Sequence, residues 1–242
     1  MKAMILAAGE GTRLGPLTME TPKVLLPIGG VPLIQHSLAW LRSYGIFEIA
    51  VNLYYLGDKI RSFLGDGSRF GVKITYSQEE TLLGTAGGVR RMEQFFNDTF
   101  MVVYGDNLTD FDLSAMLEFH QEKMALATLA IFRAPNPSEV GIVRINGQRR
   151  ITSLVEKASL GSALENLANG GIYVLEREVL SHIPSQGFSD FSYSIFPKLI
   201  KLGLPVYGYA LRPEDYFLDI GTPDNYHQSN EDMRAGKVKI KY

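Results

Sequence analysis

The sequence predicts an α/β fold in which a mixed, mostly parallel β-sheet is flanked by helices. Short apolar segments rich in Ile, Val and Leu alternate with amphipathic segments along the first half of the chain. Alternation at this spacing favours parallel strands that are joined by right-handed helical crossovers. The chain has 242 residues, of which 45% are hydrophobic and 21% charged, so it can bury a core without disulfides.

Five segments of the first half have the composition of buried strands. We expect these strands at residues 2–8, 46–53, 72–77, 99–104 and 125–132. Four intervening segments carry apolar residues at helical spacing. We expect the helices at residues 32–44, 56–64, 86–95 and 113–123, with Pro32 in the first helical turn and Trp40 in the core.

The second half has a different pattern from Gly141 onward, where short strand-like segments are separated by turns. Strands are expected at residues 141–145, 151–157 and 169–175, and helices at 192–201 and 223–235. This pattern predicts a smaller α+β portion that extends the same sheet. We therefore expect one domain over residues 1–242, with a division into two halves near residue 135.

The composition disfavours several kinds of partner and site. The 24 Lys and Arg residues are balanced by 26 Asp and Glu, which argues against nucleic acid or a membrane surface as a partner. The longest nearly apolar run, residues 124–132, is shorter than the ~20 residues of a membrane span. The absence of cysteine excludes a disulfide, a thiolate metal site and a cysteine nucleophile. A cytoplasmic location is the default expectation.

The most informative segment is the glycine-rich stretch at residues 6–30. It follows the first strand, so it lies at the carboxyl edge of a parallel sheet, where open α/β proteins bind ligands. Gly9 and Gly11 let backbone N–H groups approach a phosphate closely. Arg13 offers a planar fork for phosphate oxygens, and Lys23 offers a mobile point charge. Together these residues favour a phosphate-binding loop over a surface loop with two solvated cations.

Two other nucleotide-binding motifs fit this stretch poorly. A Walker A loop needs a Lys-Ser or Lys-Thr pair after its last glycine, and none follows here. A dinucleotide fingerprint needs GxGxxG at the start of a helix, whereas Gly9, Gly11 and Gly15 give GxGxxxG. Pro16 and Pro22 also prevent a helix directly after the glycines. The spacing therefore disfavours a P-loop protein and a dehydrogenase.

The segment GEGTRLGPLTMETPKVLLPI, residues 9–28, resembles the signature of the sugar-1-phosphate nucleotidyltransferases, also called NDP-sugar pyrophosphorylases. Four later segments agree with this family in their order: residues 79–88, 101–107, 155–173 and 217–223. The resemblance implies the GT-A-like fold of nucleotide-diphospho-sugar transferases, with a nucleotide-binding half and a sugar-phosphate-binding half. Many members continue into a β-helix. The sequence ends about one helix after residue 223, so we expect no β-helix domain.

The resemblance implies a nucleotide-binding set that comprises Leu6, Ala8, Gly9, Gly11, Thr12, Arg13, Lys23, Glu79, Gly84, Thr85 and Asp106. In the family, the LGTAG-like element closes over the base, and the residue five positions before its first glycine reads the base edge. That residue is Glu79 here. A carboxylate accepts two hydrogen bonds from guanine, whereas a glutamine suits uracil or thymine better. Glu79 therefore favours GTP.

Two aspartates follow or precede predicted elements at places suited to a metal site. Asp106 comes after the strand at 99–104, and Asp219 comes just before a helix start. Each is by itself also compatible with a turn. The resemblance implies that they converge as the two protein ligands of the catalytic metal, Mg²⁺. It also implies a sugar-phosphate-binding set that comprises Asn107, Gly141, Glu156, Lys157, Asn169 and Gly171.

The implied reaction joins a nucleoside triphosphate and a sugar 1-phosphate into an NDP-sugar and pyrophosphate. We assign Arg13 to the pyrophosphate leaving group, Lys23 to the α-phosphate and transition state, and Lys157 to the attacking phosphate. Our first choice of substrates is GTP with mannose 1-phosphate. A glucose-1-phosphate uridylyl- or thymidylyltransferase, or an aminosugar or heptose relative, is the alternative within the family.

A function of another class is a non-catalytic regulatory subunit that senses sugar nucleotides with the same fold. Such proteins tend to lose the loop cations or a metal carboxylate, and the residues at all these positions are present here. Catalysis is therefore the favoured interpretation. The sequence leaves open whether the chain assembles into a homo-oligomer.

Overall fold

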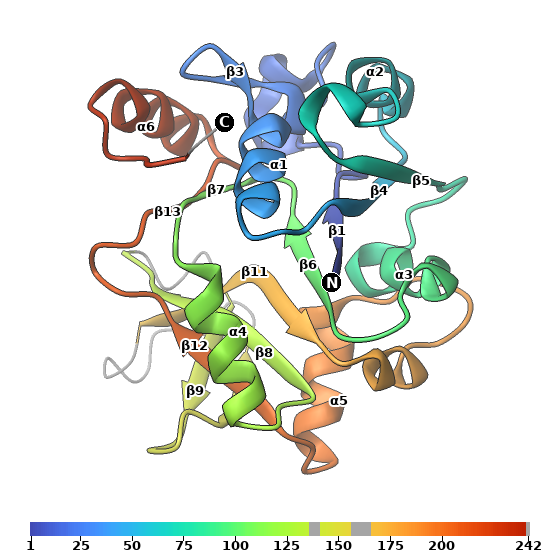
Figure 1. The fold of residues 1–242 in the computed structure, drawn as a ribbon, viewed down its shortest axis with the longest axis vertical. Helices are drawn as coiled ribbons and strands as arrows, with labels where there is room; N and C mark the ends of the chain where they lie inside the picture. The colour runs from blue at the N-terminus through green and yellow to red at the C-terminus, as the bar shows by residue number, and fades with distance from the viewer. Residues whose placement is uncertain (136–140, 156–165, 241–242) are drawn as a thin grey trace. The chain divides into compact units, whose positions relative to one another are not determined.

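The computed structural model describes residues 1–135, 141–155 and 166–240 (Figure 1). The chain divides into two compact units, each built from separate stretches of sequence. The first unit comprises residues 1–82, 103–112 and 213–242, and the second comprises residues 83–102 and 113–212. The predicted roles of the two sequence halves in binding nucleotide and sugar phosphate stay predictions.

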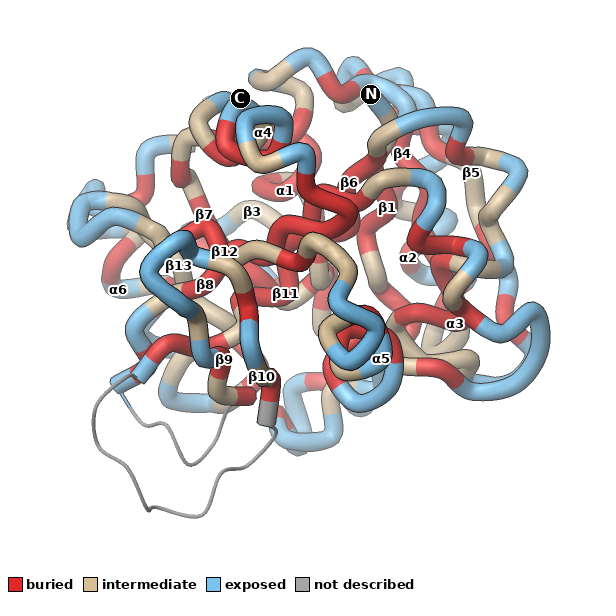
Figure 2. The backbone as a smooth tube through the Cα atoms, turned by 90° about the horizontal axis from the view of Figure 1, so that it is seen from below, coloured by how far each residue is buried: buried red, intermediate tan, exposed pale blue. Residues whose placement is uncertain are grey.

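Three parallel strands form the centre of the first unit. They are β1 (Lys2–Leu6), β4 (Glu48–Leu53) and β5 (Lys73–Gln78). In their register Leu6 lies opposite Asn52, and Asn52 lies opposite Ser77. The interiors of β1 and β4 are buried, as the red tube in Figure 2 shows. Continuous burial of this kind is typical of a parallel sheet that is covered on both faces.

Short elements complete the first unit. A hairpin of β2 (Pro27–Ile28) and β3 (Val31–Pro32) precedes α1 (Leu33–Ser43), and α2 (Gly57–Leu64) packs on β4. Strands β7 (Asn107–Thr109) and β13 (Phe217–Asp219) pair in antiparallel fashion, and α6 (Pro223–Arg234) follows β13. A buried apolar cluster joins these pieces: Leu14, Leu26, Ile28, Leu33, Leu108, Ile220 and Val238.

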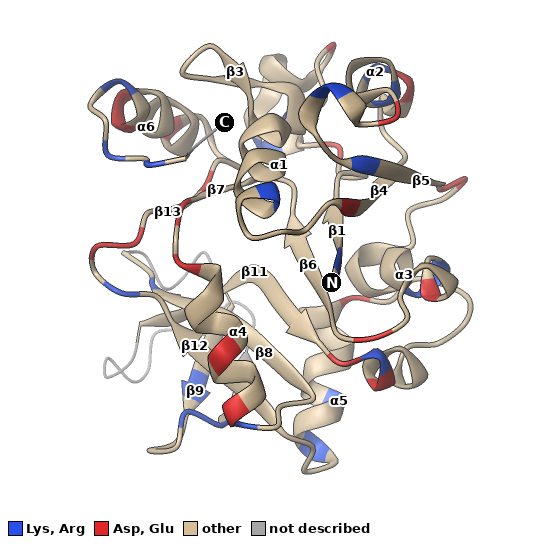
Figure 3. Ribbon diagram, viewed as in Figure 1, with Lys and Arg blue, Asp and Glu red and all other residues tan. Residues whose placement is uncertain are grey.

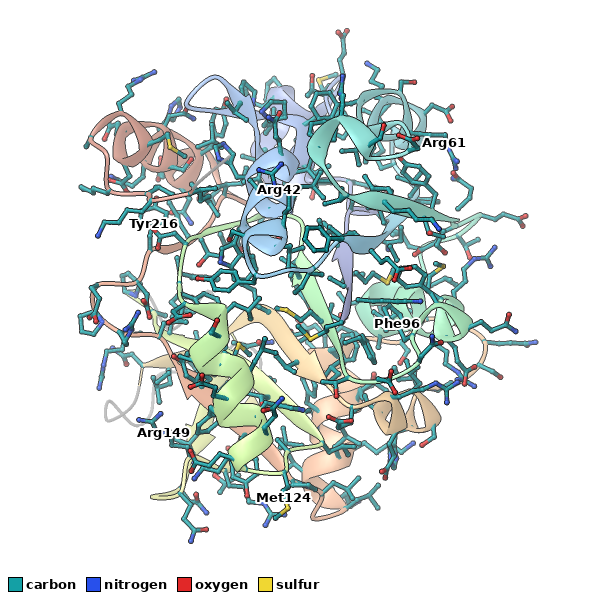
Figure 4. All side chains as sticks on the ribbon, viewed as in Figure 1. Arg42, Arg61, Phe96, Met124, Arg149 and Tyr216 are labelled. Carbon is teal, nitrogen blue, oxygen red and sulfur yellow. The ribbon has the colours of Figure 1, made fainter. Side chains whose placement is uncertain are left out.

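Hydrogen bonds connect the chain after α6 with the residues that directly follow β7 and directly precede β13. The Asp110 carboxylate accepts hydrogen bonds from the backbone N–H of Tyr216 (2.9 Å) and of Lys239 (2.7 Å). The Tyr216 hydroxyl, whose residue is labelled in Figure 4, donates to Asp232 on α6 (3.1 Å). Burial, with Asp232 and Asp110 nearby, raises the pKa of Tyr216 above its ordinary value, so the phenol stays protonated.

The second unit contains an antiparallel sheet with one parallel addition. Strand β11 (Leu167–Leu175) pairs with β8 (Ala127–Arg133) and β9 (Ile142–Ile145), and β9 pairs with β10 (Ile151–Val155). Strand β12 (Val206–Ala210) runs parallel to β8. Strand β6 (Phe100–Tyr104) carries the chain from this unit back into the first.

Helices of the second unit cover its strands. Helix α4 (Leu113–Glu122) packs on β8 and β12, and α5 (Phe196–Lys201) packs on β10 and β12. Helix α3 (Gly84–Arg91) begins the unit. In Figure 3 the ribbon is coloured for acidic residues on α4 and for basic residues on β9 and α5. Both signs of charge therefore occur within this unit, in keeping with the balanced composition.

The predicted α/β class is confirmed, and most predicted elements lie within a few residues of their expected places. Two differ in kind. The helix expected at 86–95 ends at Arg91 and is followed by a 3-10 turn, Glu93–Phe95. The helix expected at 192–201 begins with a π-helical turn, Phe191–Ile195, before α5. Within the described part of the chain, no helix is long and apolar enough to cross a membrane.

Candidate active site

The glycine-rich stretch is an ordered turn at the end of β1. A 3-10 helix at Thr12–Thr18 begins after Gly11, whose φ of 69° is in the left-handed region that favours glycine. Gly15, with φ 57° and ψ −125°, interrupts this helix. The Thr18 hydroxyl lies within hydrogen-bond distance of the carbonyl oxygens of Gly11 (3.0 Å) and Gly15 (3.2 Å), so the turn closes on itself.

Gly105 places Asp106 beside the end of β1. The Gly105 N–H donates to the Leu6 carbonyl at 2.9 Å. A Cβ at position 105 would lie 2.6 Å from that carbonyl oxygen and 2.7 Å from Val24 Cγ1. Only glycine permits this close approach, which brings the Asp106 segment next to the stretch that carries Lys23.

Lys23 and Asp106 form a largely buried ion pair between Nζ and Oδ2. Their side chains are 15% and 14% exposed. Burial by itself raises the pKa of the Asp106 carboxyl, but the neighbouring Lys23 ammonium outweighs burial and holds this pKa below its ordinary value. Asp106 is therefore a carboxylate at neutral pH.

Asp219 approaches Asp106 through the pairing of β13 with β7. Asp219 lies opposite Asn107 in that pairing, and the Ile220 N–H donates to the Asp106 carbonyl at 3.0 Å. The Asp219 carboxylate accepts from the Gly221 N–H (2.6 Å). Burial and the negative charge of Asp106 raise the pKa of Asp219 to about 6. The two aspartates that the sequence singled out are therefore electrostatic neighbours.

Arg13 reaches the same place from the glycine-rich stretch. Its Nη2 lies 3.7 Å from Asp219 Oδ2, and its side chain is 60% exposed. A Cβ on Gly221 would collide with Arg13 Nη2 and would lie 2.8 Å from Asp219 Oδ1. Glycine at position 221 therefore allows the guanidinium to lie against the turn that follows Asp219.

Four side chains form a cluster of two cations and two carboxylates: Arg13, Lys23, Asp106 and Asp219. Among the residues that the structure describes, no group of three or more His, Cys, Asp or Glu side chains could hold a metal ion. A Mg²⁺ ion is commonly bound by one or two carboxylates together with substrate phosphates and water. Two neighbouring carboxylates, one of which has a pKa raised by burial and by the charge of the other, fit such a partly protein-bound ion.

Glu79 lies at the end of β5 and is buried, with 2% of its surface exposed. Its carboxylate Oε1 accepts a hydrogen bond from Asn52 Nδ2 at 2.8 Å, and its backbone N–H donates to the Leu53 carbonyl at 2.8 Å. Asn52 Oδ1 in turn accepts from the Ala7 N–H at 2.8 Å. One asparagine thus connects the predicted base-reading residue with the start of the glycine-rich stretch.

Gly84 and Thr85 belong to the second unit, at the start of α3. Gly84 has a φ of 77°, and a Cβ there would collide with the carbonyl oxygen of Ser189. The N–H groups of Ala86 and Gly87 donate to the same carbonyl, each at 3.0 Å. The Thr85 hydroxyl donates to Asp190 (2.8 Å) and accepts from a backbone N–H. These bonds fix the entry of α3 against the segment before the π-helical turn.

The predicted sugar-phosphate residues of the second unit converge around Asn169. The Asn169 N–H donates to the Gly141 carbonyl (3.0 Å), and Asn169 Oδ1 accepts from the Gly171 N–H (3.1 Å). Asn169 Nδ2 donates to the hydroxyls of Tyr173 (2.8 Å) and Ser192 (2.9 Å). Asn107 lies in the first unit. Glu156 and Lys157 fall outside the described residues.

Sequence reasoning missed three residues that shape this site: Asn52, Gly221 and Asn225. Asn225 Nδ2 donates to the Asp219 carbonyl at 2.7 Å. Asn52 carried a signal, because a polar residue inside an apolar strand must find partners when it is buried. Gly221 and Asn225 carried none, since their contacts depend on where Arg13 and Asp219 meet.

Comparison with known proteins supports one family. The nucleotidyl transferase family model matches residues 2–236. A UTP–glucose-1-phosphate uridylyltransferase of Synechocystis sp. is 38% identical over 99% of this chain and 65% of its own length. A mannose-1-phosphate guanylyltransferase of Mycobacterium tuberculosis is 34% identical over 97% of this chain and 65% of its own length. The chain thus spans about two thirds of the length of these relatives.

A solved structure agrees over the whole chain. The crystal structure of a Bacillus anthracis protein assigned as a glucose-1-phosphate thymidylyltransferase, in complex with sucrose, has a TM-score of 0.86 and 29% identity. The match covers 100% of this chain and 97% of that one. The three similar proteins are named for different nucleotides and sugars, so similarity alone does not identify the base or the sugar.

Proposed function

The chain belongs to the nucleotidyl transferase family, and from this premise we propose that it is a sugar-1-phosphate nucleotidyltransferase. It would join a nucleoside triphosphate and a sugar 1-phosphate into an NDP-sugar and release pyrophosphate. The observation that carries this proposal is the cluster of Arg13, Lys23, Asp106 and Asp219 at the end of β1. It offers cations for phosphates and a carboxylate pair for a divalent ion in one place.

The proposed reaction depends on neutralising the phosphate charges of its substrates more than on transferring protons. A sugar 1-phosphate is already ionised at neutral pH, so it attacks the α-phosphorus without a general base. The two substrates together bring roughly six negative charges. Holding them together therefore requires cations at fixed positions.

Each cation has a place in this scheme. Lys23, buried beside Asp106, would bind the α-phosphate and stabilise the charge that develops on it in the transition state. Arg13, which is more exposed, would bind the leaving pyrophosphate through its planar fork. Lys157 would position the attacking phosphate. Asp106 and Asp219 would hold Mg²⁺, which would neutralise part of the phosphate charge.

In the free protein, the cations that we assign to phosphates are paired with the carboxylates that we assign to the metal. Lys23 lies on Asp106, and Arg13 lies near Asp219. When substrates bind, Lys23 and Arg13 would turn from these carboxylates to phosphate groups, and Asp106 and Asp219 would become available to hold the metal. Each carboxylate of the cluster thus already has a cationic neighbour before substrates arrive.

For the finer choice we propose GTP and mannose 1-phosphate as substrates. The support is Glu79, whose carboxylate would accept hydrogen bonds from the N1–H and amino group of guanine. The similarity to a mannose-1-phosphate guanylyltransferase agrees with this choice, while the similarity to a uridylyltransferase favours glucose 1-phosphate with UTP as the second candidate. An aminosugar or heptose 1-phosphate is a further alternative.

The decisive experiment is a matrix of nucleoside triphosphates against sugar 1-phosphates with Mg²⁺, scored by release of pyrophosphate from the purified protein. The expected result is release that requires both substrates, with GTP and mannose 1-phosphate as the best pair. Release with UTP or dTTP and glucose 1-phosphate would support the class and overturn the finer choice. Absence of release with every pair, while the protein still binds an NDP-sugar, would instead support a sensing subunit.

A further inference from the structure

Asn52 makes two short hydrogen bonds to residues on either side of its strand. It lies near the carboxyl end of β4, and the residue is 3% exposed. Its Oδ1 accepts from the Ala7 N–H after β1, and its Nδ2 donates to Glu79 Oε1 after β5. Because β4 pairs with both of these strands, the asparagine connects their ends across the sheet.

We propose that Asn52 is a positioning residue that decides which hydrogen-bonding group residue 79 presents to the nucleobase. This inference rests on the proposed function, since it takes Glu79 as the residue that reads the base. Asn52 itself need not touch substrate. It acts by fixing the head group of its neighbour.

The two partners of Asn52 leave its amide one orientation. The Ala7 N–H is a donor, so it must face the carbonyl Oδ1 and not the NH₂ group. The NH₂ group then faces residue 79 and needs an acceptor there. Because both bonds are buried, a flipped amide would set its NH₂ group against the Ala7 N–H and its oxygen against the Glu79 carboxylate, which is costly.

Because the donor at Asn52 is fixed, the identity of residue 79 decides which hydrogen-bonding group faces the base. With glutamate, one oxygen accepts from Asn52 and the second head-group atom is also an acceptor. With glutamine, the oxygen must turn to Asn52, and the second head-group atom becomes the NH₂ donor. Without Asn52, a glutamine could turn either way and would discriminate less.

The Watson–Crick edges of the bases respond in opposite ways to these two head groups. Guanine presents N1–H and its amino group, which require acceptors, whereas uracil presents a carbonyl that accepts from a donor. Glu79 held by Asn52 therefore matches guanine. The same asparagine with glutamine at position 79 would match uracil or thymine.

The experiment uses two substitutions, at positions 79 and 52, that exchange hydrogen-bond donors and acceptors between the two side chains. Glu79→Gln alone should lower the ratio of kcat/KM for GTP to that for UTP by at least about tenfold, the scale of one lost hydrogen bond to a charged group. Asn52→Asp combined with Glu79→Gln should raise this ratio at least about fivefold above that of Glu79→Gln. The new carboxylate still accepts from the Ala7 N–H, but it turns the glutamine so that its oxygen faces the base.

A ratio for the double variant equal to or below that of Glu79→Gln overturns the inference. The same base preference is measured without turnover as the ratio of the dissociation constants of GTP and UTP, from calorimetric titrations in the absence of sugar phosphate. If the wild-type protein transfers no nucleotide with any pair, the proposed function fails. If it transfers nucleotide and the double variant restores nothing, only the role of Asn52 fails.

Two further variants keep the test valid if Asn52→Asp with Glu79→Gln does not fold, as judged by its thermal melt. Asn52→Ala combined with Glu79→Gln should raise the GTP-to-UTP ratio above that of Glu79→Gln, because the glutamine loses the donor that holds its oxygen and can turn that oxygen to the base. A ratio equal to or below that of Glu79→Gln would show a merely structural role and overturn the inference. Ser77→Ala is the matched control. Ser77 is buried, lies opposite Asn52 in β5, and its Oγ has no hydrogen-bond partner, so this change should leave the ratio unaltered.

Discussion

Lys23 and Asp106 are 83 residues apart in sequence and form an ion pair in the interior of the first unit. The pair keeps Asp106 ionised in spite of its burial, and it keeps Lys23 at the position where a phosphate would need it. One contact thus connects the glycine-rich stretch with the proposed metal site.

Removing Lys23 should impair the chemical step more than the fold. Lys23→Ala is expected to lower kcat by at least ~10²-fold, the scale for loss of one group that stabilises transition-state charge. Steady-state release of pyrophosphate at saturating substrates measures this. Lys73→Ala, which removes an exposed lysine of β5 in the same unit, is the matched control and should leave kcat unchanged. Near-normal turnover of Lys23→Ala would contradict the assigned role.

Removing the charge of Asp219 should weaken the metal site. Asp219→Asn preserves the shape and can still accept from the Gly221 N–H, but it takes away one of two carboxylates. The half-saturating Mg²⁺ concentration should rise at least about tenfold, because a charged oxygen ligand is lost. A Mg²⁺ titration of activity, together with Mn²⁺ binding followed by electron paramagnetic resonance, tests this. Identical titrations for variant and wild type would refute Asp219 as a ligand.

Metal binding should depend on pH through Asp219. Its folded-state pKa is raised to about 6, so protons compete with the metal as the pH falls through that value. For a single site, lowering the pH from 7.5 to 5.5 weakens binding about fourfold. Mn²⁺ titration without nucleotide checks this, because substrate phosphates then add no titration of their own.

The sign of the same shift has a second consequence. A carboxyl whose folded pKa is raised contributes stability when protonated, and this contribution is lost as the pH rises through about 6. Asp219→Asn removes the titration of this carboxyl, so it is also the control for the pH dependence of metal binding. The variant should show a weaker pH dependence of Mn²⁺ affinity than wild type between pH 7.5 and 5.5. Parallel curves for the two proteins would show that another group is responsible.

Adding one methyl group beside Arg13 should separate the guanidinium from the carboxylates. Gly221→Ala places a Cβ where it collides with Arg13 Nη2, although φ at position 221 lies outside the left-handed region and suits alanine. We expect kcat/KM to fall at least about tenfold, because a displaced charge-assisted contact is lost in the transition state, with little change in melting temperature. Gly147→Ala, at a site with open space around the Cβ, is the control. Equal kinetics for both variants would remove Arg13 from the scheme.

The regular part of the fold could be predicted because its elements carry long, periodic patterns. The strands β1, β4 and β5 are apolar runs between amphipathic helices, and such runs can be recognised from the local sequence alone. The pairing of β7 with β13 could not be predicted. Each strand has three residues, and their pairing depends on register between segments that lie far apart in the chain.

The expected helix at 192–201 shows how local detail escapes a periodic pattern. Asp190 caps the start of the element by accepting from the N–H groups of Ser192 and Tyr193, and Pro197 lies in the first turn of α5. The apolar spacing continues through the whole segment, but the backbone changes from a π-helical turn to an α-helix at Phe196. Pattern matching detects the element and not this change.

The candidate site was predictable in its residue types and not in its connections. The glycine-rich stretch and the two aspartates stood out because each occurs where a strand ends or a helix begins. The bridge from Ala7 through Asn52 to Glu79 required the register of three strands, which single-sequence reasoning does not supply. The placement of Glu156 and Lys157 lies outside the described residues, so their roles stay predictions.

The first unit is assembled from three stretches of chain, and the two carboxylates arrive on different ones. During synthesis on the ribosome, the loop cations and Asp106 emerge well before Asp219 does. Nascent or prematurely terminated chains that lack the third stretch therefore contain the glycine-rich stretch with its two cations but only one of the two proposed metal carboxylates. Competence would be gained in a single late event, after the second unit has already been translated.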